Sequence, residues 1–416
     1  MTTAFSMLLR KTALMALCGI LMAAAPSGRD TAYTLDEILA IALERNPRIA
    51  AGALETKARE SAYQASRALI NPQIGFGLGR AEYHDRPEGR RTFSLAITQP
   101  IESPFKRHHR IAAERKAWEE SLQSQAARTM EVVFDLKLRF YGLLLLQERE
   151  ILLKRIAQSV REMEALVRKR AELGEVKPLE AIKLQVEALK AENDMAALQA
   201  EIDQSRENLN LLLDNALAPG FKVSGKLDSH AVSLDAEALI DRALAGHPWI
   251  QAAVNRLEQR RHTALSIKEQ RFPDFALTGF EDSGLDGVNR GIGITLSIPL
   301  WNFKSSELAE AQSLSRMSER ELGAARLELA SEIRACVRRV RLAEKTLSIF
   351  TTALLRQVEE SLAIAEASYR EGEISLLDYL DSQRTYNSVL GDYYEALFNW
   401  NVEMAALERA AGVTIR

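Results

Sequence analysis

The chain has 416 residues, a formal net charge of −3, 27% charged residues and two cysteines. A charge so close to zero gives no electrostatic reason to expect a nucleic-acid partner, and two cysteines cannot build a disulfide framework. The sequence contains no phosphate-binding loop, nucleophile elbow, zinc signature or dinucleotide fingerprint. We therefore expect neither an enzyme nor a bound cofactor or metal ion.

The N-terminus has the three parts of a secretory signal peptide, predicted over residues 1–25. Arg10 and Lys11 are its positive region, an apolar stretch follows to Met22, and residues 23–25 are alanines suited to cleavage. The apolar stretch is too short to cross a bilayer as a helix, and no later run is long and apolar enough. We expect an exported protein.

Two short helices are predicted to open the mature chain. Thr34 and Glu37 have the spacing of a capping box, which starts a helix. That helix should end at Asn46, because a residue before proline avoids the α region. A second helix is predicted over residues 48–70.

Strand pairs are predicted over residues 73–100 and 274–300. In both, aliphatic or aromatic residues alternate with Gly, Ala, Ser and Thr, which is the period of a strand with one apolar face. We predict that this face contacts lipid. Its members are Ile74, Phe76, Phe93, Leu95, Ile97, Phe275, Leu277, Ile292, Ile294 and Leu296.

The remaining sequence predicts very long helices. Residues 104–172 and 303–371 contain no proline after position 104 and have coiled-coil composition, so each could extend about 100 Å. Returning helices are predicted over 178–213 and 375–411. Gly174 and Gly372 stand at the reversals, where a left-handed backbone conformation is needed.

These elements occur twice, about 200 residues apart. Asn46-Pro47 corresponds to His247-Pro248, and Gly174-Glu175 corresponds to Gly372-Glu373. We predict a first repeat over 34–230 and a second over 231–412, which together form one integrated body. The expected fold class is mainly α with a membrane β-barrel part.

A soluble two-sheet sandwich is the alternative to a membrane barrel. It lacks a second layer, because everything outside the four strands is predicted to be helical. Four strands cannot close a barrel, and open edges in lipid leave backbone groups unpaired. Because the second face carries small residues, we expect an open lumen, and hence three chains and twelve strands rather than two chains and eight.

The chain resembles the TolC-like outer membrane efflux proteins, in particular the heavy-metal (CzcC/CusC-like) branch. The resemblance covers about residues 34–411. It is carried by the capping box before Asn46-Pro47, by Gln99-Pro100-Ile101 and, most specifically, by the run from Gly372 to Thr385.

The resemblance implies a homotrimer in outer membrane lipid, with a helical tunnel that extends into the periplasm. It implies an exit duct in a tripartite efflux system, working passively with a periplasmic adaptor and an inner-membrane pump of RND type. Metal cations or drugs would be the exported solutes. A type I protein-secretion duct and a soluble periplasmic coiled-coil scaffold or adaptor are alternatives.

The resemblance also implies roles for single residues at the periplasmic entrance. Asp378 and Asp381 match family positions whose carboxylates ring the entrance, a site that attracts cations. In the first repeat Glu180 and Lys183 stand at the corresponding positions. The ring is therefore expected from the second repeat.

Tyr369 matches a family tyrosine that helps to close the entrance. The arginine with which it acts in the family is replaced by Ile374, so the mode of closure is left open. The reversals at Gly174, Gly372 and Glu373 match the periplasmic tips to which the adaptor docks.

One basic cluster covers residues 106–110 and includes His108 and His109. A metal site would need further ligands, and none stands at helical spacing from them. We expect a solvated patch.

Overall fold

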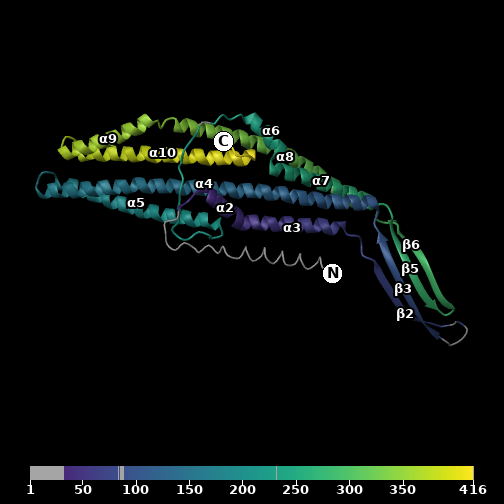
Figure 1. The fold of residues 1–416 in the computed structure, drawn as a ribbon. Coiled ribbons are helices and arrows are strands. Elements are labelled where there is room, and N and C mark those ends of the chain that lie inside the picture. The colour runs from purple at the N-terminus through teal and green to yellow at the C-terminus, as the bar shows by residue number, and fades with distance from the viewer. Residues whose placement is uncertain (1–31, 83, 85–88, 231, 416) are drawn as a thin grey trace, which may run out of the picture.

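The computed structural model describes residues 32–82, 84, 89–230 and 232–415. The predicted signal peptide and most of the loop between the first two strands lie outside these residues. The described chain is one elongated body in which long helices run side by side and four strands project from one end (Figure 1). Within the described residues no helix is long and apolar enough to cross a membrane.

The first helices begin as predicted. α2 (Leu35–Arg45) has a capping box in which the Glu37 N–H donates to the Thr34 hydroxyl and the Thr34 N–H donates to the Glu37 carboxylate. α3 (Pro47–Arg67) is capped by Asn46, whose side-chain oxygen accepts from two backbone N–H groups. The helix ends at Arg67, three residues before the predicted end.

The second repeat begins in the same way, with α6 (Ala236–Gly246) and α7 (Pro248–Glu269). His247 takes the place of Asn46: its Nδ1 accepts from the Trp249 N–H at 3.2 Å. Its Nε2 therefore carries the proton and donates to the Arg409 carbonyl at 3.1 Å. Burial lowers the pKa of His247, which keeps the ring neutral for this role.

The long helices lie in coiled pairs. α4 (Pro104–Glu172) packs along α5 (Pro178–Leu211), and α10 (Leu376–Ala411) packs along both α8 (Ser305–Leu347) and α9 (Thr352–Glu371). A short parallel pairing of β1 (Ala32–Tyr33) with β4 (Lys222–Val223) closes the first repeat.

A single helix over residues 303–371 was predicted, and this prediction is wrong. The helix breaks between Leu347 and Thr352. The Ser348 hydroxyl donates to the Lys345 carbonyl at 2.7 Å, and the Thr351 hydroxyl accepts from the Leu354 N–H at 3.2 Å, which starts a new helix. Hydroxyl side chains compete with the helical hydrogen bonds in this way.

The strands form one antiparallel sheet in the order β2-β3-β5-β6. Their bounds are β2 (Gln73–Glu82), β3 (Gly89–Ile101), β5 (Asp274–Gly284) and β6 (Gly287–Ser297). β5 and β6 join through a two-residue turn at residues 285–286. Gly287, the first residue of β6, has a φ of +138° that only glycine adopts readily. The second pair ends at Ser297, before the predicted residue 300.

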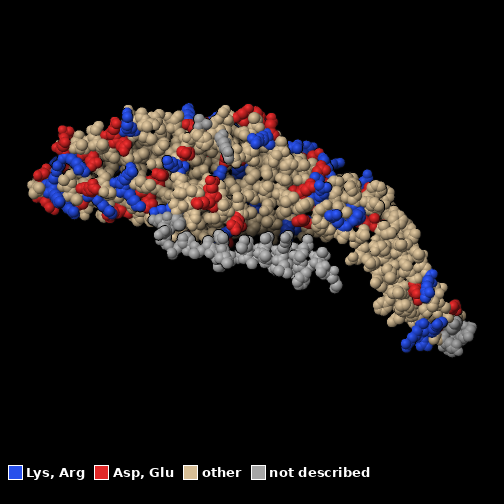
Figure 2. Space-filling view, in the orientation of Figure 1, with Lys and Arg blue, Asp and Glu red and all other residues tan. Residues whose placement is uncertain are grey.

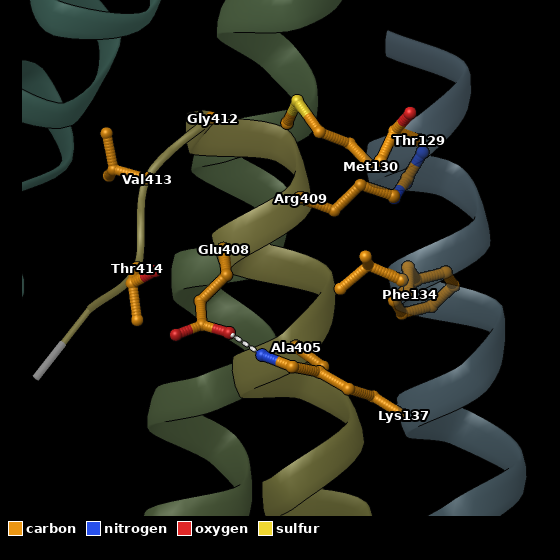
Figure 3. Close-up of a pocket in the computed structure, with 11 residues that line it drawn as sticks. Thr129, Met130, Phe134, Lys137, Ala405, Glu408, Arg409, Gly412, Val413 and Thr414 are labelled. Atoms are coloured by element: carbon orange, nitrogen blue, oxygen red, sulfur yellow. Dashed lines mark hydrogen bonds and ion pairs between the residues drawn. The ribbon is translucent and has the colours of Figure 1, made fainter. Parts of the chain in front are cut away.

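The core follows the contacts between helices. One buried cluster joins α6, α7, α8 and α10, a second joins α2, α4 and α5, and a third lies at the far tip. A cavity of about 190 Å³ lies between α4 and the last turns of α10 (Figure 3). Lys137 of α4 pairs there with Glu408, which also accepts from the Ile415 N–H. Arg409 pairs with Glu131 and Glu332, so this region fastens the C-terminal end to the helical wall.

Candidate functional site

One face of the sheet carries the residues that were predicted to contact lipid. Residues directly opposite each other in an antiparallel pair lie on the same face. The register places Phe76 opposite Leu95, Leu277 opposite Ile294, and Phe275 opposite both Ile101 and Leu296. All ten predicted side chains thus share one face, and each is at least 37% exposed in the single chain. Their contact with lipid stays a prediction.

The opposite face is made of small and polar side chains. Gly77 lies opposite Ser94, and the hydroxyls of Thr98 and Thr278 lie 3.0 Å apart across β3 and β5. Phe280 is the bulky exception, and Gly291 faces it. Side chains of this size leave room for a lumen when several chains surround it.

The middle of the sheet is uncharged. Residues 73–79, 92–101, 275–280 and 291–297 contain no Asp, Glu, Lys or Arg. Figure 2 shows this band between charged residues at the strand tips and at the helix ends. At the helix end, Lys106 pairs with Asp274 at 2.9 Å and Arg110 with Glu102 at 2.7 Å. A band of this kind fits the apolar belt of a membrane barrel, about 25 Å tall.

Both outer edges of the sheet are open. β2 has 10 residues and β6 has 11, and no strand of the described chain pairs with the outer side of either. An open edge in hydrocarbon would cost several kcal/mol for each unpaired backbone group. The band is therefore incomplete in a single chain.

At the far tip, Tyr369 joins the two repeats. Its hydroxyl donates to the Glu180 carboxylate at 3.2 Å, and its ring stacks on Tyr379 at 5.7 Å. Burial, followed by the neighbouring Glu180 charge, raises the pKa of Tyr369 to about 12, so the hydroxyl keeps its proton. Ile374, which replaces the family arginine, packs against this cluster. The sequence had indicated Glu180 only as the counterpart of Asp378, not as the acceptor for Tyr369.

Asp378 and Asp381 lie on the exposed face of α10, and Tyr379 and Leu380 between them are buried. The Asp378 carboxylate accepts from the Ser375 N–H at 3.1 Å and from its hydroxyl at 2.7 Å. Asp378 therefore also completes the capping box of α10. Its role, and that of Asp381, in an entrance ring stays a prediction.

The two reversals have the backbone that was predicted for them. Gly174 has a φ of +74° and Gly372 a φ of +83°. Arg170 donates to the Arg370 carbonyl at 2.6 Å, which ties the two tips together, and the Ser368 hydroxyl donates to Glu373 at 3.2 Å. Docking of an adaptor at Gly174, Gly372 and Glu373 stays a prediction.

The basic cluster after β3 is not simply a solvated patch. The Nδ1 atoms of His109 and His262 lie 3.2 Å apart and link α4 to α7. Burial lowers the pKa of His262, and the charge of His109 lowers it further. No spacing rule could find this pair, because the two residues are far apart in sequence. Among the described residues no three His, Cys, Asp or Glu side chains are grouped so that they could hold a metal ion.

An open-edged sheet with an apolar outer band, carried on a helix of 69 residues, defines a subunit of a membrane channel with a long tunnel. The chain belongs to the outer membrane efflux protein family, whose model matches residues 38–215 and again residues 239–413. The double match confirms the internal repeat. It also places the protein in the outer membrane and in a family of channels rather than enzymes, so the soluble scaffold alternative is wrong.

Named relatives agree with this assignment. The cobalt-zinc-cadmium resistance protein CzcC of Cupriavidus metallidurans is 24% identical over 87% of this chain and 88% of its own length. Among solved structures, CusC has a TM-score of 0.77 at 16% identity, covering 94% of this chain and 96% of that one. The CmeC outer membrane channel of Campylobacter jejuni has a TM-score of 0.76 at 16% identity, covering 94% and 91%. The two structures show the shared fold.

Proposed function

We propose that this protein is the outer-membrane exit duct of a tripartite efflux system. In this proposal it is a homotrimer that conducts solutes passively and docks onto a periplasmic adaptor and an inner-membrane pump, of RND type. The observation that carries the proposal is the four-stranded sheet with an apolar outer band and two open edges, continued by α4, whose 69 residues extend about 100 Å. A duct of that length spans the outer membrane and reaches far into the periplasm.

The strands support closure by further copies of the chain. Two chains supply eight strands, whose interior is filled by side chains, whereas three supply twelve and leave a passage. The inner face of Gly, Ala, Ser and Thr residues suits a passage. In the trimer, β6 of one chain pairs with β2 of the next, so that no edge stays open.

The helices support the same closure. α5 packs on α4, α4 on α10 and α10 on α9, so α5 and α9 are the outer helices of the tunnel wall. α5 buries Leu184 and Ala191 against α4. At helical spacing, a second apolar stripe falls on the opposite side of α5. It consists of Leu179, Ile182, Val186 and Leu189, all between 56% and 60% exposed. We assign this stripe to α9 of the next chain, on which Ala363 and Ala367 are exposed.

Polar substitution of this stripe should weaken the trimer. Ile182→Asn combined with Val186→Asn removes about 1.5–3 kcal/mol of apolar burial per side chain in each interface. Light scattering of the detergent-solubilised protein should then show dissociation at concentrations where the parent is trimeric. The matched control is Leu327→Asn with Leu342→Asn, which changes exposed apolar residues of α8, away from the stripe. Equal behaviour of the two variants would show that the stripe is not the interface.

We propose that the hydrogen bond from Tyr369 to Glu180 holds the entrance closed. It joins α9 to α5 within one chain, across the two repeats. The stacked Tyr379 and the contact of Arg170 with the Arg370 carbonyl support the same closed arrangement. No arginine is needed at position 374 for this contact.

Loss of the Tyr369 hydroxyl should open the entrance. Tyr369→Phe leaves the Glu180 carboxylate without the hydroxyl that donates to it. This should destabilise the closed state of the entrance by about 1–2 kcal/mol. The open fraction in single-channel recordings should rise roughly tenfold, while the control Tyr393→Phe should leave it unchanged.

The same contact should depend on pH. The folded pKa of about 12 lies above the ordinary 10.0, so the stabilisation is fully present below about pH 10 and is lost as the pH rises toward 12. An open fraction that did not change across this range in the parent would contradict the proposed closure.

Cations are the solutes that the entrance suits best. Three copies of Asp378 and Asp381 would place carboxylates around the mouth, and such rings favour cations. The relative named for cobalt, zinc and cadmium resistance supports metal ions among them. Drugs are the second solute class that this type of duct could conduct.

Planar-bilayer recording tests the proposal. The purified protein should give stepwise, cation-favouring conductance without an energy source. Silent or anion-favouring bilayers would contradict it. Crosslinking in cells should capture an adaptor and a pump, whereas capture of an ABC-type exporter would instead support the type I secretion alternative.

A further inference from the structure

A cleft of about 490 Å³ lies where the strands join the helices. Its lining is mainly apolar and includes two carboxylates, Glu269 and Glu102, of which Glu102 is paired with Arg110. Its side chains come from the end of β3, the start of α4 and the segment between α7 and β5. Ile101 and Phe275 lie directly opposite each other and belong to the apolar outer face of the sheet. Phe105 and Phe272 continue that face beyond the strands. The cleft is therefore continuous with the face of the sheet that is predicted to contact lipid.

Aromatic side chains are exposed at this level. Phe105 is 69% exposed, Phe272 61%, Phe303 59% and Trp301 92%. Exposed aromatic rings at the end of an apolar band are typical of the boundary between membrane and water. This boundary is the periplasmic one, because the long helices start here.

Each of these aromatic segments carries a cation beside it. Lys106 and Arg107 follow Phe105, Arg271 precedes Phe272, and Lys304 follows Phe303. Arg271 is exposed, and the Arg107 guanidinium donates to a backbone carbonyl at 2.6 Å. Lys106 is paired with Asp274 and Lys304 with Glu307. Arg271 is therefore the cation beside these aromatic residues that suits the phosphate of a lipid headgroup.

We propose that this cleft binds one phospholipid of the periplasmic leaflet of the outer membrane in each chain. An acyl chain lies against Phe105, Phe272 and Phe275, and the phosphate lies beside Arg271. The bound lipid fills the gap between the start of α4 and the end of α7 and so connects the membrane band to the tunnel wall.

Retention of lipid by the purified trimer tests this site. Native mass spectrometry of protein extracted in mild detergent should show phospholipid bound to the parent, up to one per chain. Phe105→Ala combined with Phe272→Ala should reduce that occupancy about tenfold, because two apolar contact surfaces are lost. The matched control, Leu342→Ala with Ile349→Ala, removes similarly exposed apolar groups from the periplasmic part. Equal occupancy in both variants, or no phospholipid on the parent, would overturn the proposal.

A fluorescence measurement keeps the site testable if the double variant fails to assemble. In a background whose four native tryptophans are replaced by phenylalanine, Phe272→Trp places a single reporter in the cleft, and a phospholipid with brominated acyl chains should quench its emission in nanodiscs. Water-soluble bromide should quench it at least several-fold less. The opposite order would show that water, not lipid, occupies the cleft.

Discussion

Replacing Ile294 with arginine should prevent assembly of the protein in the outer membrane, whereas arginine at the adjacent Thr295 should be tolerated. Ile294 lies opposite Leu277 in the middle of the apolar outer face, and Thr295 lies on the small-residue face. An arginine facing lipid near the bilayer midplane costs about 2–4 kcal/mol. Three chains would triple this cost in one barrel, while an arginine in the lumen stays hydrated.

Heat-modifiable migration and membrane fractionation measure this difference. Ile294→Arg should be lost from the outer membrane fraction, and Thr295→Arg should be recovered there as an assembled species. The two substitutions add the same side chain at neighbouring positions, so general damage to the strand would affect both. If Thr295→Arg failed and Ile294→Arg assembled, the two faces of the sheet would be assigned the wrong way round.

Neutralising the entrance carboxylates should remove the preference for cations. Asp378→Asn with Asp381→Asn eliminates two charges per chain around the mouth of the trimer, and the cation-to-anion permeability ratio should fall several-fold. The effect should be largest at low salt, because at 1 M the Debye length is only about 3 Å. Asparagine is the suitable replacement, since an oxygen at position 378 still accepts from Ser375 and keeps the cap of α10.

The matched control removes the same charge elsewhere. Asp36→Asn with Asp241→Asn neutralises exposed residues on the short helices α2 and α6, and the permeability ratio should not change. A ratio that fell equally in both variants would reflect overall charge rather than an entrance ring. A ratio that did not fall in the entrance variant would place the selectivity elsewhere.

Elements with a strong local pattern could be predicted from the sequence. The start of α2 follows from Thr34 and Glu37, and α4 has the predicted bounds, residues 104–172. The register of the sheet was predictable only as two faces, because alternation tells which residues share a face but not which residues are opposite each other. The two glycine reversals followed from the need for a positive φ.

Contacts between distant segments could not be predicted. The acceptor for Tyr369 is Glu180 in the other repeat, and the partner of His109 is His262. Both contacts depend on how the helices pack, which no spacing in the sequence encodes. The break after Leu347 depends on hydrogen bonds made by the hydroxyls of Ser348 and Thr351. Serine and threonine also occur on the polar face of an unbroken helix, so their presence in the sequence does not predict a break.

The mass of the folded protein in lipid and in plain buffer tests the central claim most directly. Protein refolded from denaturant into phospholipid nanodiscs should have the mass of three chains, and in buffer without detergent or lipid it should aggregate or stay unfolded. A monodisperse, cooperatively folding single chain in plain buffer would contradict the account, because the open edges and apolar face of the sheet would then need neither neighbours nor lipid.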